Sequence, residues 1–313
     1  MKIGIYAPWA NGDMIMSTPF LKYKEQIWPG AQIVWFVLPE ENHHATCLHR
    51  ASPDIMAHNP YVSEIRPSTS NPSDVIRLRV GHRTNSEGHP LTVGLENSGR
   101  IVPGSRPAEF SDLDLLYFPA PQHNCDKLTT PFGLITRFVF AYPPGAEIHP
   151  CLYFSPEEDA KAETFLTSLP HKHSVMLETA YNSGQSYWDE DLTRQVMHAL
   201  RSILGFVNFV FASPGTHKPF LDDAGVVDCS AFSIRQCIPV FNRCHLFMGT
   251  SSGISHAVSS WSANPNTRRI DCTNNPAISI RCTARGACSV ALRREEVLPI
   301  LVAEATALKA RRT

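Results

Sequence analysis

The sequence lacks the long apolar runs that would indicate a membrane protein or a secreted one. No stretch approaches the roughly 20 consecutive apolar residues that a membrane-spanning helix needs. The opening residues, MKIGIYAPWANGD, hold too short an apolar run for a signal peptide, because Pro8 and Gly12 interrupt it. We therefore expect a cytoplasmic protein.

An excess of one charge is also missing. The chain has 28 Lys and Arg residues against 29 Asp and Glu residues, a formal net charge of -1. Such a balance supplies no counterion-release force toward nucleic acid, and no local basic cluster compensates for it. We therefore expect no nucleic-acid partner.

Paired cysteine motifs are absent as well. The nine cysteines are an odd number and include no C-x-x-C pair, which argues against a disulfide framework. Cys272, Cys282 and Cys288 gather near the end of the chain, but a zinc site needs a fourth ligand and tighter spacing. Buried or loop thiols are the favoured interpretation, and we expect no metal and no bound cofactor.

What is present is a repeated alternation of strands and helices. Apolar runs at 3–7 and 33–38 flank the segment MIMSTPFLKYKEQIW, which has helical periodicity. The second run is uniformly apolar, as in a parallel strand covered on both faces. The pattern predicts a strand–helix–strand unit at the start of the chain.

The alternation restarts after the middle of the 313-residue chain. Ser155 and Pro156 open a capped helix, which we interpret as a linker. Beyond it the sequence predicts strands at 174–177, 207–212 and 245–248 and helices at 190–204, 233–242 and 294–309. The fold class is α/β, with two Rossmann-like doubly wound domains facing across a cleft (1–153 and 173–313) and a linker at 154–172.

Two junctions between a strand and a helix carry candidate chemistry. Gly12 and Asp13 follow the first strand, where open α/β sheets bind ligands. A carboxylate there is either a general base or an ordinary helix cap, and its position fits both roles.

The second junction is the segment FMGTSSGISH, from Phe247 to His256. Its small residues let a ligand approach the backbone, and the start of a helix favours a phosphate or diphosphate. Thr250, Ser251 and Ser252 would line this loop, and His256 would donate to a phosphate oxygen. Ordinary helix capping and a buried core histidine remain the alternatives.

The order of these segments resembles the bacterial heptosyltransferase family (glycosyltransferase family 9, GT-B arrangement). The stretch GDMIMSTPFLKYKEQIWPGAQIVWFV is similar to the opening of that family. His58-Asn-Pro-Tyr-Val62, FNRCHLFMGTSSGISHAVSS and the closing Arg294-Glu-Glu-Val resemble later segments in the same order. The similarity extends over nearly the whole chain.

The resemblance implies an acceptor-binding first domain and a second domain that binds a nucleotide-diphosphate sugar. It places Asp13 as the catalytic base and Gly12 and Ser17 near the acceptor. The remaining residues that it implies hold the donor: Thr179, Thr250, Ser251, Ser252, Gly253 and His256. The reaction would be inverting and independent of metal.

Three positions depart from the family pattern. Ser251 stands where the family has Asp, Ser186 where it has Lys, and Thr216 where it has Glu. The loss of the Lys removes a positive charge from the leaving phosphate, so the nature of the donor stays open.

We therefore predict transfer of a sugar, with heptose as one candidate, to a glycan or lipid-glycan acceptor, as in lipopolysaccharide biosynthesis. A lipid-linked acceptor would bring peripheral contact with the inner face of a membrane. Two alternatives stay open: a catalytically degenerate nucleotide- or glycan-binding protein, and a nucleotide-sugar epimerase. The sequence does not determine the nucleobase, the acceptor or the oligomeric state.

Overall fold

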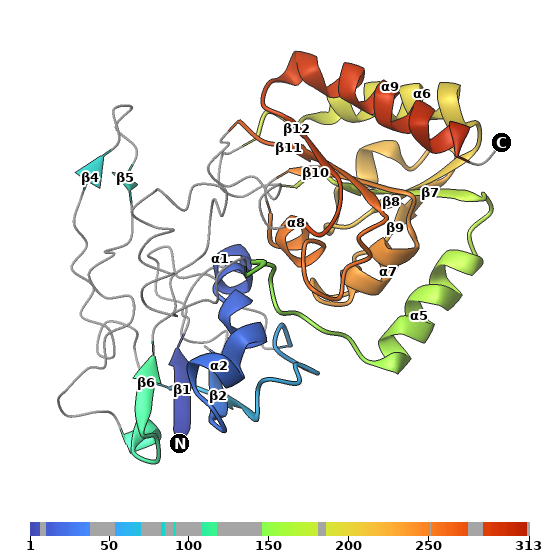
Figure 1. Ribbon diagram of the computed structural model, residues 1–313. Helices are drawn as coiled ribbons and strands as arrows, with labels where there is room; N and C mark the ends of the chain where they lie inside the picture. The colour runs from blue at the N-terminus through green and yellow to red at the C-terminus, as the bar shows by residue number, and fades with distance from the viewer. Residues whose placement is uncertain are drawn as a thin grey trace. The chain divides into compact units, whose positions relative to one another are not determined.

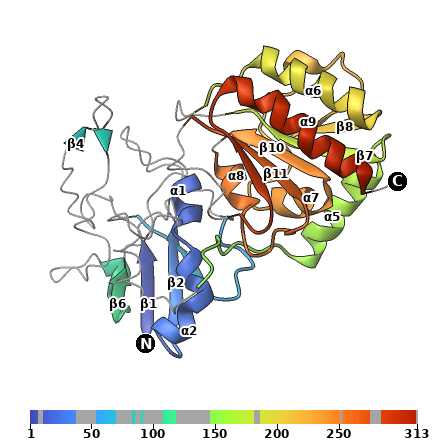
Figure 2. The same cartoon turned by 45° about the horizontal axis from the view of Figure 1, so that its top comes forward.

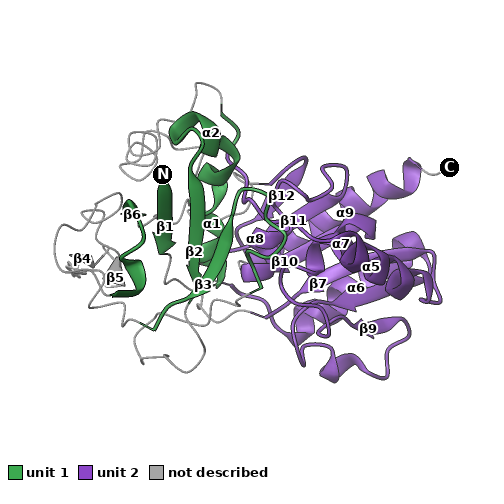
Figure 3. Cartoon of the chain, turned by 90° about the horizontal axis from the view of Figure 1, so that it is seen from below, with its two compact units in different colours: residues 1–122, 127–147 green, residues 123–126, 148–313 purple. Residues whose placement is uncertain are grey.

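The chain forms two compact units of α/β structure in a computed structural model (Figures 1 and 3). Residues 1–122 and 127–147 make unit 1, and residues 123–126 and 148–313 make unit 2. The described residues are 1–6, 11–37, 54–69, 83–84, 90–91, 108–117, 146–180, 186–250, 252–274 and 284–311. Our predicted boundary fell at 153, and the predicted cleft between the domains stays a prediction.

Unit 1 is built on a parallel sheet whose described strands have the order β3-β2-β1-β6. Its elements are β1 (Lys2–Tyr6), α1 (Asn11–Met16), α2 (Lys24–Ile27), β2 (Gln32–Val37), β3 (Glu64–Pro67) and β6 (Leu115–Tyr117), with a small hairpin of β4 (Arg83–Thr84) and β5 (Pro90–Leu91). Strand β2 is buried from Ile33 to Val37, as its uniformly apolar sequence predicts.

The predicted helix between β1 and β2 is divided into three pieces. Helix α1 ends at Met16, a 3₁₀ helix spans Pro19–Tyr23, and α2 follows. Proline has no N–H and fixes its own φ, so Pro19 begins a new helical segment and does not extend α1. The apolar periodicity of this segment correctly predicted helical structure, and Pro19 explains why the helix is interrupted.

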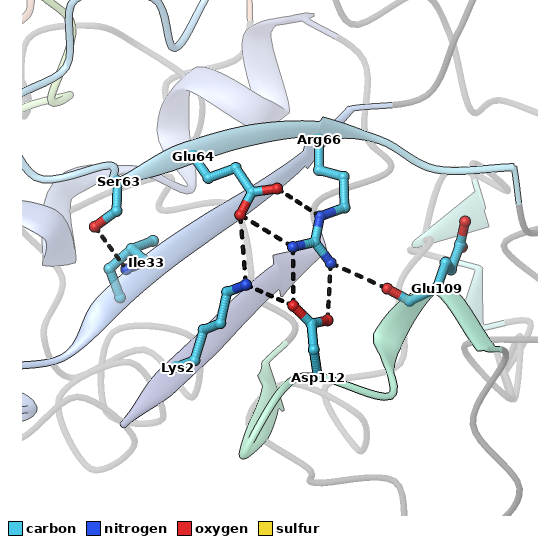
Figure 4. A network of polar contacts seen from close by, with 7 residues as sticks. All are labelled: Lys2, Ile33, Ser63, Glu64, Arg66, Glu109 and Asp112. Carbon is cyan, nitrogen blue, oxygen red and sulfur yellow. Dashed lines mark hydrogen bonds and ion pairs between the residues drawn. The ribbon is translucent and has the colours of Figure 1, made fainter.

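A network of charged side chains connects strands of the sheet in unit 1 with the segment before β6 (Figure 4). Arg66 on β3 donates from Nε to Glu64 Oε1 (2.7 Å) and from Nη1 to Asp112 Oδ1 (2.9 Å). Lys2 Nζ lies 3.5 Å from Glu64 Oε2. The hydrogen bonds from Arg66 and Lys2 lower the pKa of the Asp112 carboxyl. These charged groups pair with one another. We therefore interpret the network as structural: it joins β1, β3 and the 108–112 segment.

Unit 2 contains a larger parallel sheet with the order β12-β11-β10-β7-β8-β9 in the described residues. Its strands are β7 (His173–Glu178), β8 (Val207–Phe211), β9 (Val226–Asp228), β10 (Leu246–Thr250), β11 (Arg268–Cys272) and β12 (Cys288–Ala291). Its helices are α5 (Pro156–Thr167), α6 (Glu190–Leu204), α7 (Cys237–Arg243), α8 (Gly253–Ala257) and α9 (Arg294–Ala310).

The two faces of this sheet carry different helices (Figure 2). Helices α6 and α9 cover one face, where Leu192, Val196 and Leu301 pack against alternate strand residues such as Val175 and Phe209 in a continuous apolar core. Helices α5, α7 and α8 lie on the opposite side of the sheet (Figures 1 and 2). A parallel sheet covered on both faces is the doubly wound arrangement that the sequence predicted.

Helix α5 belongs to unit 2. Ser155 caps it in a complete capping box with Glu158, as the sequence predicted for Ser155. Glu158 also forms an ion pair with the buried Arg235, and Asp159 pairs with Arg243 on α7. Hydrogen bonds from Arg235, Gln236 and the Ser155 N–H lower the pKa of Glu158 to about 2 despite its burial. The predicted linker is therefore a helix fixed to α7 by its charges.

Most strongly periodic segments form the elements that the sequence predicts. Helix α6 spans Glu190–Leu204, the predicted range, and α9 extends one residue beyond its own. The sequence did not predict β3, β9, β11 or β12, and α7 begins at Cys237, four residues later than predicted. Residues 132–142, whose sequence also predicts a helix, lie outside the described residues. None of the described helices has the length and hydropathy required to span a bilayer.

One glycine gives a direct test of this packing. Gly225 has φ +78°, and a Cβ there would lie 2.3 Å from the Val207 carbonyl oxygen. We expect Gly225→Ala to lower the free energy of unfolding by about 3 kcal/mol, since backbone strain and a clash with backbone act together. Gly215 has φ +77° but would contact only the flexible end of Lys218, so Gly215→Ala should cost only about 1 kcal/mol. Equal losses in urea denaturation would contradict this assignment.

Candidate functional site

The order of the strands in unit 2 reverses between β7 and β10. From β7 the chain proceeds to β8 and β9 on one side, and then returns to β10, β11 and β12 on the other. Connections that diverge in this way leave a crevice beyond the carboxyl ends of the two central strands, where open α/β sheets bind ligands. Residues 178–180 lie at the end of β7, and Gly249, Thr250 and Ser252 lie at the end of β10 or close after it. We call this region the switch-point edge.

Hydrogen bonds hold the two strand ends together. Thr250 Oγ1 donates to the Ala180 carbonyl oxygen at 2.9 Å. Ser255 Oγ donates to the Thr250 carbonyl oxygen, and the Ser255 N–H donates to Ser252 Oγ at 3.2 Å. Ser252 is thus the N-cap of α8, which is the role that the sequence left open as the alternative to donor binding. The hydroxyl of Thr250 donates its hydrogen bond to a backbone carbonyl group.

The structure brings the predicted donor residues to this one edge with different exposures. Thr179, Ser252 and Gly253 are half-buried. Thr250 is 0% exposed and His256 is 5% exposed, so both lie mostly beneath the surface. The half-buried residues offer a hydroxyl or an N–H to a ligand more directly than the buried pair does. Ser251 lies outside the described residues.

The predicted catalytic base Asp13 and the predicted acceptor-binding residues Gly12 and Ser17 follow β1 in unit 1. Gly12 and Asp13 lie in the first turn of α1, which begins at Asn11. The side chain of Asp13 lies outside the described part of the chain. Ser17 is buried just after the helix, and its N–H donates to the Met14 carbonyl oxygen at 3.0 Å. The roles of these three residues stay predictions.

Two of the three positions that depart from the family pattern, Ser186 and Thr216, carry hydroxyls that hydrogen-bond within the protein, and the third, Ser251, lies outside the described residues. Ser186 is 9% exposed; its Oγ accepts from the Trp188 N–H at 3.2 Å and lies 3.5 Å from the Cys272 carbonyl oxygen. Thr216 Oγ1 donates to the Ser213 carbonyl oxygen at 2.7 Å. The neighbouring residue His217 has its Nδ1 3.5 Å from Asp228 Oδ1.

Sequence reasoning missed one titratable residue at the switch-point edge. Glu178 ends β7 and is 0% exposed. Ser213 Oγ, in the loop after β8, lies 2.8 Å from both of its carboxyl oxygens. Burial raises the pKa of Glu178 to about 8, although hydrogen bonds from Ser213 and the Ala180 N–H act in the opposite direction. The signal in the sequence is an acid that ends an otherwise apolar run, SVMLE.

Gly249 makes space for this buried carboxyl. It pairs with Glu178 across the β7–β10 ladder. A Cβ at position 249 would lie 2.9 Å from Glu178 Cβ and 2.7 Å from Phe247 Cζ. Those distances are too short for carbon atoms, so any larger residue would displace Glu178 or Phe247.

The cysteines near the end of the chain do not form a metal cluster in the part that the structure describes. Cys272 is buried on β11 and Cys288 is half-buried on β12. Across these strands Cys272 pairs with Ala291 and Cys288 pairs with Arg269, so the two thiols lie at different levels of the ladder. Cys282 lies outside the described residues. No group of three or more His, Cys, Asp or Glu residues among those described is placed to hold a metal ion.

The bond between the two strand ends can be tested by substitution. Thr250→Val keeps the shape of the side chain but leaves the Ala180 carbonyl oxygen without its donor. We expect it to lower the free energy of unfolding by about 1–3 kcal/mol, because a buried acceptor loses its partner. Thr250→Ser retains the hydroxyl and should lose less than Thr250→Val in the same denaturation experiment. A larger loss in the serine variant would show that methyl packing matters more.

Comparisons with known proteins give a consistent fold. No family model and no curated protein sequence matches the chain. Among solved structures, the glycosyl transferase family 9 protein from Veillonella parvula has a TM-score of 0.61 at 15% identity, covering 99% of this chain and 97% of its own. The E. coli ADP-heptose lps heptosyltransferase II has a TM-score of 0.61 at 13% identity, covering 99% of both chains. The E. coli heptosyltransferase WaaC with ADP has a TM-score of 0.54 at 16% identity, covering 97% and 100%. The chain therefore has the two-domain α/β fold of the family 9 glycosyltransferases, along nearly its whole length.

Proposed function

We propose that this protein is a glycosyltransferase that moves a sugar from a nucleoside-diphosphate sugar to a glycan or lipid-glycan acceptor. The observation that carries the proposal is the switch-point edge of unit 2. There the ends of β7 and β10 are joined, and Thr179, Ser252 and Gly253, which follow these strands, are half-buried. That edge belongs to a chain whose fold matches family 9 glycosyltransferases over nearly its whole length.

The chemistry of the edge suits a diphosphate. The first N–H groups of an α-helix have no carbonyl partner within the helix, and they carry the positive end of its dipole. Ser252 caps α8, which leaves Gly253 at the first helical position with no side chain to obstruct a phosphate. One of the solved structures of similar fold is described as WaaC with ADP, a nucleoside diphosphate.

The proposed reaction proceeds by direct displacement. Asp13 accepts the proton of the acceptor hydroxyl, whose oxygen then attacks the anomeric carbon of the donor sugar. The bond from that carbon to the diphosphate breaks, and the nucleoside diphosphate leaves with the electron pair. Attack from the face opposite the leaving group inverts the anomeric configuration. Hydrogen-bond donors at the switch-point edge stabilise the charge that develops on the diphosphate, without a metal ion.

The proposal can be extended to a specific donor sugar and a specific acceptor. Two of the solved structures of similar fold are described as heptosyltransferases, one of them as an ADP-heptose lps heptosyltransferase. ADP-heptose is therefore the first donor to test, with a lipopolysaccharide core as the first acceptor.

A second candidate function is nucleotide binding without turnover. The observation in its favour is Ser186, whose buried hydroxyl contacts backbone groups where the family pattern has a lysine. No cation at that position would neutralise the leaving diphosphate. Turnover separates this candidate from the first, because both predict binding of a nucleoside diphosphate.

The donor edge can be tested by adding charge without changing the helix cap. Ser252→Asp and Ser252→Asn both retain an N-cap acceptor, so both should leave the melting temperature nearly unchanged. The aspartate places a negative charge beside the phosphates, and we expect it to weaken ADP binding at least about tenfold. The asparagine should bind ADP within about threefold of the parent protein. Isothermal calorimetry against ADP, GDP, UDP and CMP measures both effects; equal affinities in the two variants would contradict the assignment.

The proposed base is tested by turnover. We expect Asp13→Asn to lower the release of nucleoside diphosphate from the donor about 10²–10⁴-fold in the presence of acceptor. Donor affinity should not change, because the proton transfer is not part of donor binding. Asp222→Asn, at an exposed position of unit 2, is the control. Donor binding with no turnover in the parent protein, for every acceptor tried, would favour the binding protein.

A further inference from the structure

Glu178 has an environment that suits a carboxylic acid better than a carboxylate. Ser213 Oγ lies 2.8 Å from Oε1 and also 2.8 Å from Oε2. A protonated carboxyl donates its O–H to the serine oxygen, while the serine O–H donates back to the second carboxyl oxygen. Two hydrogen bonds then account for two short distances. An ionised carboxylate has no proton to give, so the single serine proton would have to serve both oxygens.

The groups around Glu178 supply no charge to balance an anion. On β10 it meets Gly249 and Phe247. On α7, Cys237 interacts electrostatically with Glu178; it is a buried thiol whose pKa is raised well above its ordinary value by its contact with Cys229 and by burial. Among the described residues, no Lys, Arg or His forms an ion pair with Glu178.

The other charged residues that the structure describes on this face of the sheet in unit 2 form no ion pair with Glu178 either. Asp271 pairs with Gly249 from β11, on the far side of β10 from Glu178. Arg269, two residues earlier, donates to backbone carbonyls, including Val258 and Asn264. On α8 the titratable side chain is His256, which is buried.

The carboxyl is linked through Ser213 to the loop after β8. The Ser213 carbonyl oxygen accepts from Thr216 Oγ1 at 2.7 Å, and this residue pair closes the turn that continues to His217. His217 in turn faces Asp228 at the end of β9. A change at Glu178 is therefore transmitted to the 213–217 loop, at the carboxyl end of the strand next to the switch-point edge.

We propose that Glu178 is a positioning residue that works as a neutral carboxylic acid: it holds Ser213 and the 213–217 loop in place, and binding of a nucleoside diphosphate weakens when Glu178 loses its proton. The part that concerns the nucleotide rests on the proposed function. The part that concerns the protonation of Glu178 stands on the geometry alone.

The direction of the pH effect follows from the raised pKa. Burial raises the pKa of Glu178 to about 8, from an ordinary value of 4.5. The folded protein therefore holds a proton that the unfolded chain releases between these two values. The stabilisation is complete below pH 4.5 and is lost as the pH rises through about 8.

Glu178→Gln is the decisive variant, because an amide has the shape of the neutral acid and donates and accepts in the same way without titrating. Melting temperature and ADP affinity would be measured from about pH 6 to about pH 9.5 for the parent protein, Glu178→Gln and Ser213→Ala. In the parent protein we expect both to fall as the pH passes through about 8, with ADP affinity falling at least about fivefold.

The outcomes separate the two parts of the proposal. In Glu178→Gln the fall in melting temperature across this range should be smaller than in the parent, and ADP affinity should be nearly constant. Ser213→Ala should bind ADP more weakly even at the low end of the range. An unchanged pH profile in Glu178→Gln would overturn the proposal. Failure of the parent protein to bind any nucleotide would remove the proposed function, while the melting profiles would still decide the protonation of Glu178.

A second measurement covers the case in which Glu178→Gln does not fold. Infrared difference spectra of the parent protein, with and without isotope-labelled glutamate, detect the carbonyl band of a protonated glutamic acid. We expect that band to persist at neutral pH and to disappear as the pH rises through about 8. Its absence at neutral pH would show that Glu178 is ionised and would overturn the proposal.

Discussion

The close approach of two strands at Gly249 is the constraint on which the switch-point edge depends. With no side chain there, the carboxyl of Glu178 fits between β10 and the loop after β8, and Ser213 reaches both of its oxygens. The same ladder places Thr250 beside Ala180, where one hydrogen bond joins the ends of β7 and β10. One missing side chain therefore sets the positions of the polar groups that surround the candidate donor site.

The fold could be predicted from the sequence where apolar periodicity was strong, as in α6 and β7. It was not predicted where buried residues carry charge. Strand β11 reads Arg268-Arg-Ile-Asp-Cys272, which resembles an exposed segment, yet Arg269 and Asp271 are fully buried. Arg269 is compensated by backbone carbonyls from distant loops, and such partners cannot be read from local sequence. Strands β9 and β12 are short, so they offered too little pattern.

The candidate site was predictable in location but only partly in composition. The alternation of strands and helices predicts that ligands bind beyond strand ends, and the Ser-Gly loop before α8 marks one of those ends. Glu178 was missed because its partner Ser213 lies 35 residues away, and only the folded sheet brings them together. His256 was expected to donate to a phosphate oxygen; it is 5% exposed, and that role stays a prediction.

The strand order of unit 2 also bears on how the protein is made. Strands β7, β8 and β9 are contiguous in the chain and form one half of the sheet, while β10, β11 and β12 follow and form the other. On a ribosome the first half can pair as soon as it emerges, but β7 then has one open edge until β10, which ends at Thr250, is available. An unpaired edge of buried, apolar residues is prone to pair with other chains. The two neighbours at the switch-point edge, β7 and β10, thus meet only after the first half of the sheet has been made, and until then the open edge of β7 is a place where the nascent chain can pair with another chain.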